Sequence, residues 1–112
     1  MNEKPPPLGT LRERVGIFSK QTSIDAEGGH DVSFVPLGLA WARVSATVAR
    51  DRIGDGVATA ITHTVVLRHR TDIAPGDRIV WGGRTLEVIG AEDLNGRRAY
   101  LVCRCLETVI AG

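Results

Sequence analysis

Residues 62–70, THTVVLRHR, combine strong β propensity with side chains that could bind a metal ion or a phosphate. A structural zinc site needs four converging nitrogen or sulfur ligands. Strand alternation places His63 and His69 on one face, but six residues apart, too far to share one ion directly. The chain also has no Cys-x-x-Cys or His-x₃-His spacing. The pattern favours histidines at the rim of a core, and we expect no metal.

The other groups that could do chemistry are scattered. Nucleophilic catalysis needs a Ser or Cys beside an oriented base, and the sequence has no Gly-x-Ser-x-Gly elbow. The carboxylate pairs Asp51 with Asp55 and Glu92 with Asp93 fall in predicted loops, where solvation explains them. No glycine-rich phosphate loop opens a helix. We therefore expect neither an enzyme nor a cofactor.

The two cysteines, Cys103 and Cys105, are predicted to be free. Two residues apart in a strand, they project in parallel from one face, which is unfavourable for a disulfide. Buried, reduced thiols suit a reducing cytoplasm. The N-terminus has no apolar signal region and no apolar run approaches the roughly 20 residues of a membrane helix. We therefore expect a soluble protein that does not contact a membrane.

Length and composition predict one small domain. The chain has 112 residues, 43% hydrophobic and 24% charged, with a net charge of +1. Such a balanced charge argues against a dedicated duplex-DNA binder. We expect a flexible Pro-rich arm over 1–10, a single β domain over 11–108 and a short tail over 109–112.

The N-terminal half reads as strands separated by turns. Residues 11–23 contain an alternating stretch, and DAEGGH at 25–30 reads as a turn. Residues 32–48 are β-branched but interrupted by Pro36, which predicts an edge strand or two pieces with a bend. Residues 45–60 are predicted to form a long loop whose tip is near Asp55; a short helix over 47–53 is the alternative.

The C-terminal half reads as a meander of three strands, 78–81, 84–90 and 97–109. Two-residue turns at 82–83 and 95–96 predict that Ile79 pairs with Leu86 and that Val88 pairs with Cys103. One face then carries Ile79, Trp81, Leu86, Val88, Leu101, Cys103 and Cys105. The other face carries Arg78, Glu87 and Arg104 as a ladder of alternating charge. The predicted fold is mainly β, a small barrel or sandwich with one long inter-strand loop.

The order of these motifs resembles the head–tail joining proteins of long-tailed bacteriophages, also called head-closure or stopper proteins, and their gene transfer agent relatives. The resemblance runs from about Leu11 to Glu107. It is carried by LRERV at 11–15, DAEGG at 25–29, WARV at 41–44, THTVVLRHR at 62–70, RIVWGGRTLEVIG at 78–90 and GRRAYLVCRCLE at 96–107. The sequence departs from the family pattern after Val44, where SATVARDRIGDG stands.

The resemblance implies a structural protein in the neck of a virion or gene transfer agent particle, present in the bacterial cytoplasm before assembly. Several copies would form a ring between portal or adaptor proteins and the tail terminator or tail tube. The ring would retain packaged double-stranded DNA and offer a platform for the tail.

Two groups of residues follow as candidates from the resemblance and from local charge. The expected channel loop contains Arg50, Asp51, Arg52, Gly54, Asp55 and Gly56. The expected subunit interface contains Arg12, Arg14, Arg68, Arg70 and Arg98. The alternative is a small β-barrel that binds nucleic acid through a basic face, although only Tyr100 could stack on a base there.

Overall fold

The computed structural model describes residues 11–53 and 56–110, with side chains over 11–46 and 61–107. Its regular elements are β1 (Glu13–Ile24), β2 (His30–Ile53), β3 (Gly56–Arg68), β4 (Arg78–Trp81), β5 (Arg84–Asp93), the 3₁₀ turn η2 (Leu94–Gly96) and β6 (Tyr100–Ile110). The predicted β class and the small barrel are confirmed. The predicted arm over 1–10 lies outside the described residues. Of the predicted tail, residues 109–110 belong to β6 and the last two lie outside the described residues.

The strands form a closed antiparallel barrel in the order β1-β2-β3-β6-β5-β4. Its interior is filled by side chains from every strand, because alternate residues of each strand point inward. The buried apolar residues are Leu11, Val15, Ile17, Ala42, Val65, Leu67, Ile73, Ile79, Leu86, Val88, Leu101, Cys103 and Cys105.

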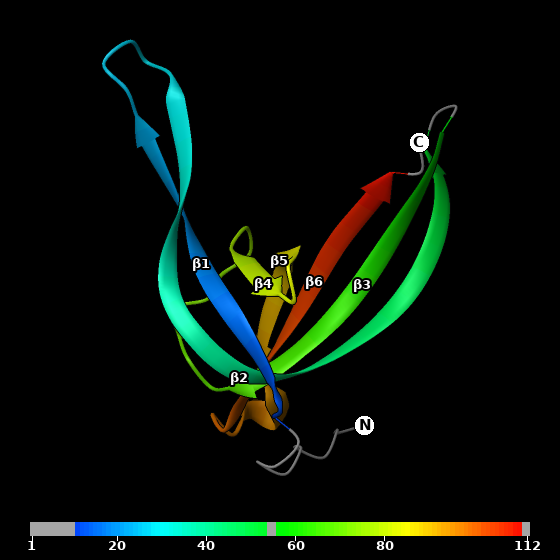
Figure 1. The fold of residues 1–112 in the computed structure, drawn as a ribbon. Helices are drawn as coiled ribbons and strands as arrows, with labels where there is room; N and C mark the ends of the chain where they lie inside the picture. The colour runs from blue at the N-terminus through cyan, green and yellow to red at the C-terminus, as the bar shows by residue number, and fades with distance from the viewer. Residues whose placement is uncertain (1–10, 54–55, 111–112) are drawn as a thin grey trace.

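Two ribbons project from this barrel and give the molecule a V shape (Figure 1). One is the β1–β2 hairpin, whose turn at 25–29 is the one that the sequence predicts. The other is the outer part of the β2–β3 hairpin. The 24-residue strand β2 takes part in both, and Ala42 pairs with Glu13 of β1 and Leu67 of β3.

The sequence predicts an edge strand around Pro36, or two strand pieces with a bend between them. This prediction is wrong, because β2 continues through Pro36 as one strand. Pro36 lies opposite Phe18 and Gly38 lies opposite Ile17, so Leu37 is an extra residue in the ladder. A bulge of this kind bends a strand and leaves one residue unpaired, which accommodates a proline without ending the strand.

The predicted loop over 45–60 is corrected too. Residues 45–53 pair with 56–64 in an unbroken antiparallel ladder, from Ser45 with Thr64 to Ile53 with Gly56. The charged residues that suggested a loop have uncharged partners, with Arg50 opposite Thr59, so no like charges face each other. Gly54 and Asp55 lie between the strands, outside the described residues.

The C-terminal meander matches the sequence prediction at its first hairpin and differs at its second. Ile79 pairs with Leu86 as expected, across a turn in which Gly82 and Gly83 have φ of 56° and 80°. Val88 pairs with Cys105 instead of Cys103, and a bulge lies between Val88 and Gly90. The connection is longer than two residues because η2 and residues 97–99 form it.

This correction shifts β6 by two residues and therefore leaves the inward face unchanged, since side chains alternate with a period of two. The predicted charge ladder is lost, because Glu87 lies opposite Leu106 and Arg104 lies opposite Gly90. Trp81 is the exception on the predicted core face. It is only partly buried and packs at the margin of the core, where its indole N–H donates to Glu13 at 3.2 Å.

The barrel closes between β1 and β4 along a short seam. Three residue pairs form its ladder: Gly16 with Val80, Ile17 with Ile79, and Phe18 with Arg78. A side-chain bond extends the seam at each end. The Trp81–Glu13 bond lies at one end, and at the other the backbone N–H of Lys20 donates to the carboxylate of Asp77 at 2.9 Å.

Candidate functional site

Within the described part of the chain, no group of three or more His, Cys, Asp or Glu side chains lies close enough to hold a metal ion. The two cysteines are free and buried. Burial raises the pKa of Cys103 to about 11, although nearby Arg70 opposes the rise, and raises the pKa of Cys105 to about 12. Thiols that stay protonated are poor nucleophiles at neutral pH.

His63 is fully buried, whereas the sequence places it at the rim of the core. Neither ring nitrogen has a hydrogen-bond partner among the described residues. The imidazole contacts the indole of Trp81 edge-on, with ring centroids 5.7 Å apart. His63 therefore acts as a core side chain.

Among the described residues, no helix is long and apolar enough to cross a membrane.

Three adjoining depressions lie at the base of the barrel, opposite the two projecting ribbons. The first, of about 370 Å³, is lined by Arg68, His69, Arg98, Ala99 and Tyr100. The second, of about 260 Å³, shares Arg68 and His69 with it and adds Ala40, Trp41, Leu67 and Arg70. The third is lined by Arg14, Leu39, Ala40 and Trp41. We call this region the base surface.

The backbone around Arg98 is held in an unusual conformation. Arg98 has a φ of 56°, a left-handed value that costs free energy for a residue with a side chain. Its N–H donates to both carboxylate oxygens of Asp93, at 2.9 and 3.0 Å, and this stabilises the turn. No residue in the described part of the chain forms an ion pair with the guanidinium of Arg98 or Arg68.

The remaining arginines of the predicted subunit interface have contacts within the chain. Arg70 forms a bidentate ion pair with Asp72, at 2.5 and 2.6 Å. This hydrogen bonding lowers the pKa of Asp72 and raises that of Arg70. Arg14 stacks on Trp41, 4.7 Å from the ring centroid. Arg12 precedes β1 and also has an interaction within the chain.

The structure therefore brings Arg68 and Arg98 together, with Arg70 and Arg14 at the margin of the same surface. The predicted channel residues fall elsewhere. Arg50, Asp51 and Arg52 lie in the outer part of β2, and Gly56 begins β3.

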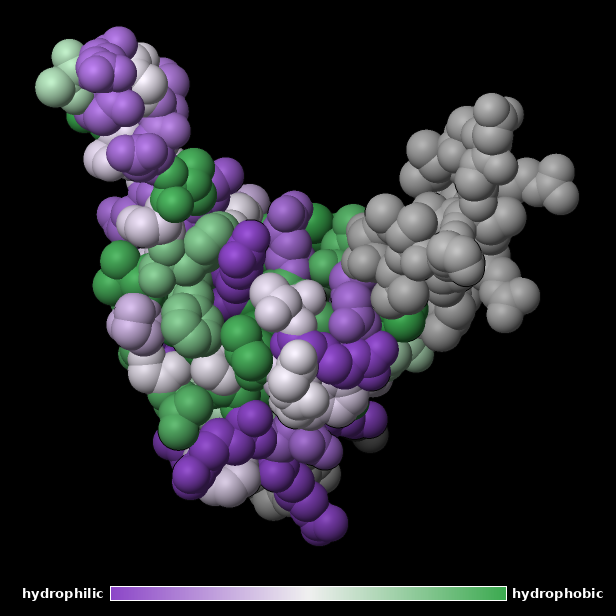
Figure 2. Space-filling view, turned by 45° about the horizontal axis from the view of Figure 1, so that its top comes forward, coloured by the Kyte–Doolittle hydropathy of each residue, from purple (hydrophilic) through white to green (hydrophobic). Residues whose placement is uncertain are grey.

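Apolar side chains are exposed along the β1–β2 side of the molecule. Leu39 is 66% exposed and Trp41 is 52% exposed on the base surface, while Ile24, Val32 and Val35 are exposed on the projecting hairpin. In Figure 2, hydrophobic residues lie among less hydrophobic ones along this side, between two hydrophilic ends. A group of exposed apolar side chains is typical of protein contacts.

The turn of the β1–β2 hairpin is acidic. Residues 25–31 contain Asp25, Glu27 and Asp31 and no Lys or Arg. The Asp25 carboxylate accepts the N–H groups of Glu27 and Gly29, at 2.9 and 2.7 Å, and so fixes the turn. The Glu27 and Asp31 side chains are exposed, and no residue in the described part of the chain forms an ion pair with them. We call this turn the acidic tip.

Sequence reasoning missed two features. Asp77 belongs to no motif in the sequence, yet it is buried and its carboxylate accepts the backbone N–H of Lys20 in β1. The base surface combines residues from β2, β3 and the connection before β6. No local sequence motif predicts that these residues lie together. The Arg68–Tyr100 cross-strand pair becomes visible only once the β3–β6 pairing is known.

These observations define a class of protein: a small β barrel without a catalytic constellation in its described part, with exposed apolar and charged surfaces suited to assembly. The family model of the phage head completion protein matches residues 6–108. The chain belongs to this family. It accordingly has a structural role in completing a phage-type head, as a component of the particle beside other structural proteins.

Solved structures share the fold. A chain from the virion of a native gene transfer agent particle superposes with a TM-score of 0.74 at 21% identity, covering 89% of this chain and 96% of that one. Protein SF1141 from Shigella flexneri 2a gives 0.65 at 25% identity, covering 89% and 95%. The protein xkdH of the phage-like element PBSX from Bacillus subtilis gives 0.50 at 15% identity, covering 83% and 91%. No curated protein matches the sequence significantly.

Proposed function

We propose that this protein is a non-catalytic head-closure protein. Several copies form a ring between the portal–adaptor complex and the tail, retain packaged double-stranded DNA and offer the tail its attachment platform. Membership of the phage head completion family supports this role. It would act in the neck of the particle after synthesis in the host cytoplasm.

The observation that carries the proposal is the pair of ribbons projecting from a closed barrel (Figure 1). A barrel without free edges in its body is a stable building block that does not add strands indiscriminately. Ribbons that extend beyond it can reach other subunits or a channel without disturbing the core. We assign the outer β2–β3 ribbon, with Arg50, Asp51 and Arg52 in its last rungs, to the channel.

The mixed charges of this ribbon suit a meeting of several copies around an axis. An Arg of one copy can pair with an Asp of the next, so the ribbons attract one another where ribbons of a single charge would repel. Such a constriction can hold DNA and still separate when the tail attaches.

The test is a particle preparation that lacks this protein. Heads without it should package DNA, lose it during purification and carry no tails. Adding purified protein should restore DNA retention and tail attachment. Heads that keep their DNA and acquire tails without this protein would refute the proposal.

Arg68 and Arg98, which form no ion pair with any described residue, favour one second candidate, a nucleic-acid-binding module. Phosphate binding releases counterions, so the affinity for duplex DNA would fall steeply with salt. Trp41 stacks with Arg14, whereas Tyr100 on the base surface has no stacking partner among the described residues. Tight, salt-sensitive binding of free DNA by the purified protein would favour this candidate.

A further inference from the structure

We infer that neighbouring copies of this chain contact one another head to tail, with the acidic tip of one copy in the base surface of the next. The inference rests on the proposed ring and names the two surfaces that form it. It places Glu27 and Asp31 of one copy against Arg68 and Arg98 of its neighbour.

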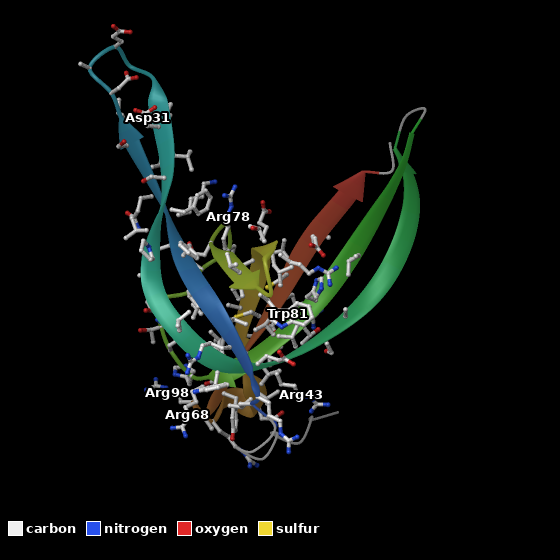
Figure 3. All side chains as sticks on the ribbon, viewed as in Figure 1. Asp31, Arg43, Arg68, Arg78, Trp81 and Arg98 are labelled. Carbon is white, nitrogen blue, oxygen red and sulfur yellow. The ribbon has the colours of Figure 1, made fainter. Side chains whose placement is uncertain are left out.

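The first support is the separation of unpaired charge. Figure 3 shows Asp31 on the projecting hairpin and Arg43, Arg68 and Arg98 at the opposite end of the molecule. No residue in the described part of the chain forms an ion pair with these side chains. Within one copy these groups cannot meet. Between two copies, opposite charges at opposite ends attract and orient the partners.

The second support is the match of apolar surface beside the charges. Exposed apolar side chains lie on both faces of the hairpin next to the acidic tip: Val35 (45% exposed) shares the face of Asp31, and Ile24 (72%) and Val32 (53%) lie on the opposite face. Leu39 and Trp41 lie beside the arginines of the base surface. A hairpin that places Asp31 against Arg68 can place Val35, on the same face, against these side chains.

The exposed apolar side chains of the base surface distinguish a protein hairpin from DNA as its binding partner. A DNA backbone could occupy the arginine depression but offers no aliphatic surface for Leu39 and Trp41. A hairpin with an acidic turn and apolar flanks satisfies both parts. The interface then has the usual anatomy of an apolar centre with a charged rim.

The third support is symmetry. Two different surfaces at opposite ends of one molecule can form a heterologous contact that repeats from copy to copy, and such contacts generate a ring if the rotation closes. A reciprocal two-fold dimer, in which two copies make the same contact twice, would give crosslinked dimers and no ladder of larger multimers. The elongated shape, 47 × 38 × 27 Å, separates the two surfaces and leaves both accessible in one molecule.

The hydrogen bonds within the turn also explain why the acidic tip can dock without changing its conformation. The Asp25 carboxylate holds the turn through two backbone N–H groups, and Gly28, with a φ of 84°, takes a conformation that other residues rarely adopt. A turn that is fixed before contact loses little conformational entropy on docking.

The test uses charge reversal. Asp31→Lys and Arg68→Glu should each lower incorporation into particles about tenfold, since a like-charge contact replaces an attractive one. The double variant restores the attraction and should recover incorporation. Arg104→Glu and Glu92→Lys reverse exposed charges outside both surfaces and serve as matched controls, with incorporation unchanged. Normal incorporation of both single variants would overturn the inference.

A second measurement separates this contact from the ring itself. In particles carrying Asp31→Cys together with Arg68→Cys, a short bis-maleimide should produce a ladder of multimers, and each single variant should not. Buried Cys103 and Cys105 should not react. Particles that contain the double variant without a ladder overturn the contact and leave the ring proposal standing. If wild-type protein never enters particles, the proposed function fails and the contact fails with it. Loss of DNA binding by Arg68→Glu without rescue in the double variant would assign the surface to phosphate instead.

Discussion

The backbone N–H of Lys20 donates to the carboxylate of Asp77 at 2.9 Å, joining two residues that are 57 positions apart in the chain. The same carboxylate accepts the N–H of Ala74 at 2.9 Å, and the Asp77 carbonyl accepts the N–H of Val88 at 2.8 Å. One buried residue therefore fixes the turn before β4 and fastens one end of the β1–β4 seam.

Replacing Asp77 by Ala should lower the free energy of unfolding by about 2–4 kcal/mol, because two partly buried N–H groups lose a charged acceptor. Asp77→Asn keeps one acceptor oxygen and should cost less. Denaturant unfolding of the purified variants measures both effects. Asp31→Asn, on the exposed acidic tip, is the control and should leave stability unchanged. A stable Asp77→Ala variant would show that the seam does not depend on this carboxylate.

Replacing His63 by Leu should stabilise the protein by about 1–3 kcal/mol. The imidazole is buried with both nitrogens unsatisfied, and removing a buried polar group without a partner removes its desolvation cost. Leu has a similar volume, so the core should accept it. Thermal unfolding gives the measurement, with exposed His30→Leu as the control. A melting temperature that drops in His63→Leu would mean that the imidazole finds a partner in solution.

The two cysteines predict a loss of stability at alkaline pH. Both thiols have raised pKa values in the folded protein, about 11 for Cys103 and about 12 for Cys105, against 9.0 for an unperturbed thiol. Between these values the unfolded chain has lost protons that the folded chain keeps. Their stabilising contribution is therefore complete below pH 9 and declines as the pH rises toward 11 and 12.

The expected decline is about 1.4 kcal/mol per pH unit for each thiol within that window. Unfolding curves between pH 8 and 11 test it, since a variant with Cys103→Val and Cys105→Val should show a flatter dependence than the wild type. Equal slopes in the two proteins would assign the decline to other groups. Alkylation by iodoacetamide at neutral pH should require unfolding.

Shortening the β2–β3 ribbon should separate folding from DNA retention. Replacing residues 49–60 by Asn-Gly closes the hairpin at the Val48–Ile61 pair and leaves the inner rungs intact. The shortened protein should fold and enter particles, but filled heads should leak DNA because the ribbons no longer meet.

A full-length variant with Arg50, Asp51 and Arg52 changed to Thr isolates the contribution of charge from that of length. The assay is nuclease-protected DNA per head. Full retention by heads that carry the shortened ribbon would exclude the channel role of this segment.

Sequence patterns predicted the inward faces well because burial depends on alternation, which is local. The hairpin at Gly82 and Gly83 was also predictable in register, since two adjacent glycines adopt the left-handed angles that its turn requires. The second hairpin was not. Asn95 and Arg98 both have positive φ, and this lengthened connection has no simple sequence signature. The predicted register of β6 is therefore wrong by two residues. The predicted core face remains correct, but the predicted charge ladder does not form.

The candidate surfaces were harder to predict for a physical reason. Local charge identifies Arg68 and Arg98 as candidates, but their shared depression depends on the β3–β6 register. The ribbon over 45–60 looked like a loop because its charges and glycines match loop composition. In the structure, the β2 part of this ribbon pairs with β3, and β3 pairs in turn with β6. This pairing outweighs the local preference for a loop.

The short β1–β4 seam also has a consequence for the order of folding. It joins Gly16 to Val80 across most of the domain, whereas neighbouring strands in sequence form the β1–β2, β2–β3, β4–β5 and β5–β6 ladders. Closing so long a segment costs conformational entropy, and the three residue pairs of the seam stabilise the barrel only after it has closed. We expect the hairpins to form first and the seam to close last, at a rate that limits folding. In the native protein the amide hydrogens of the same seam should be the first to exchange with solvent, because the contact that forms last in folding is also the first to open.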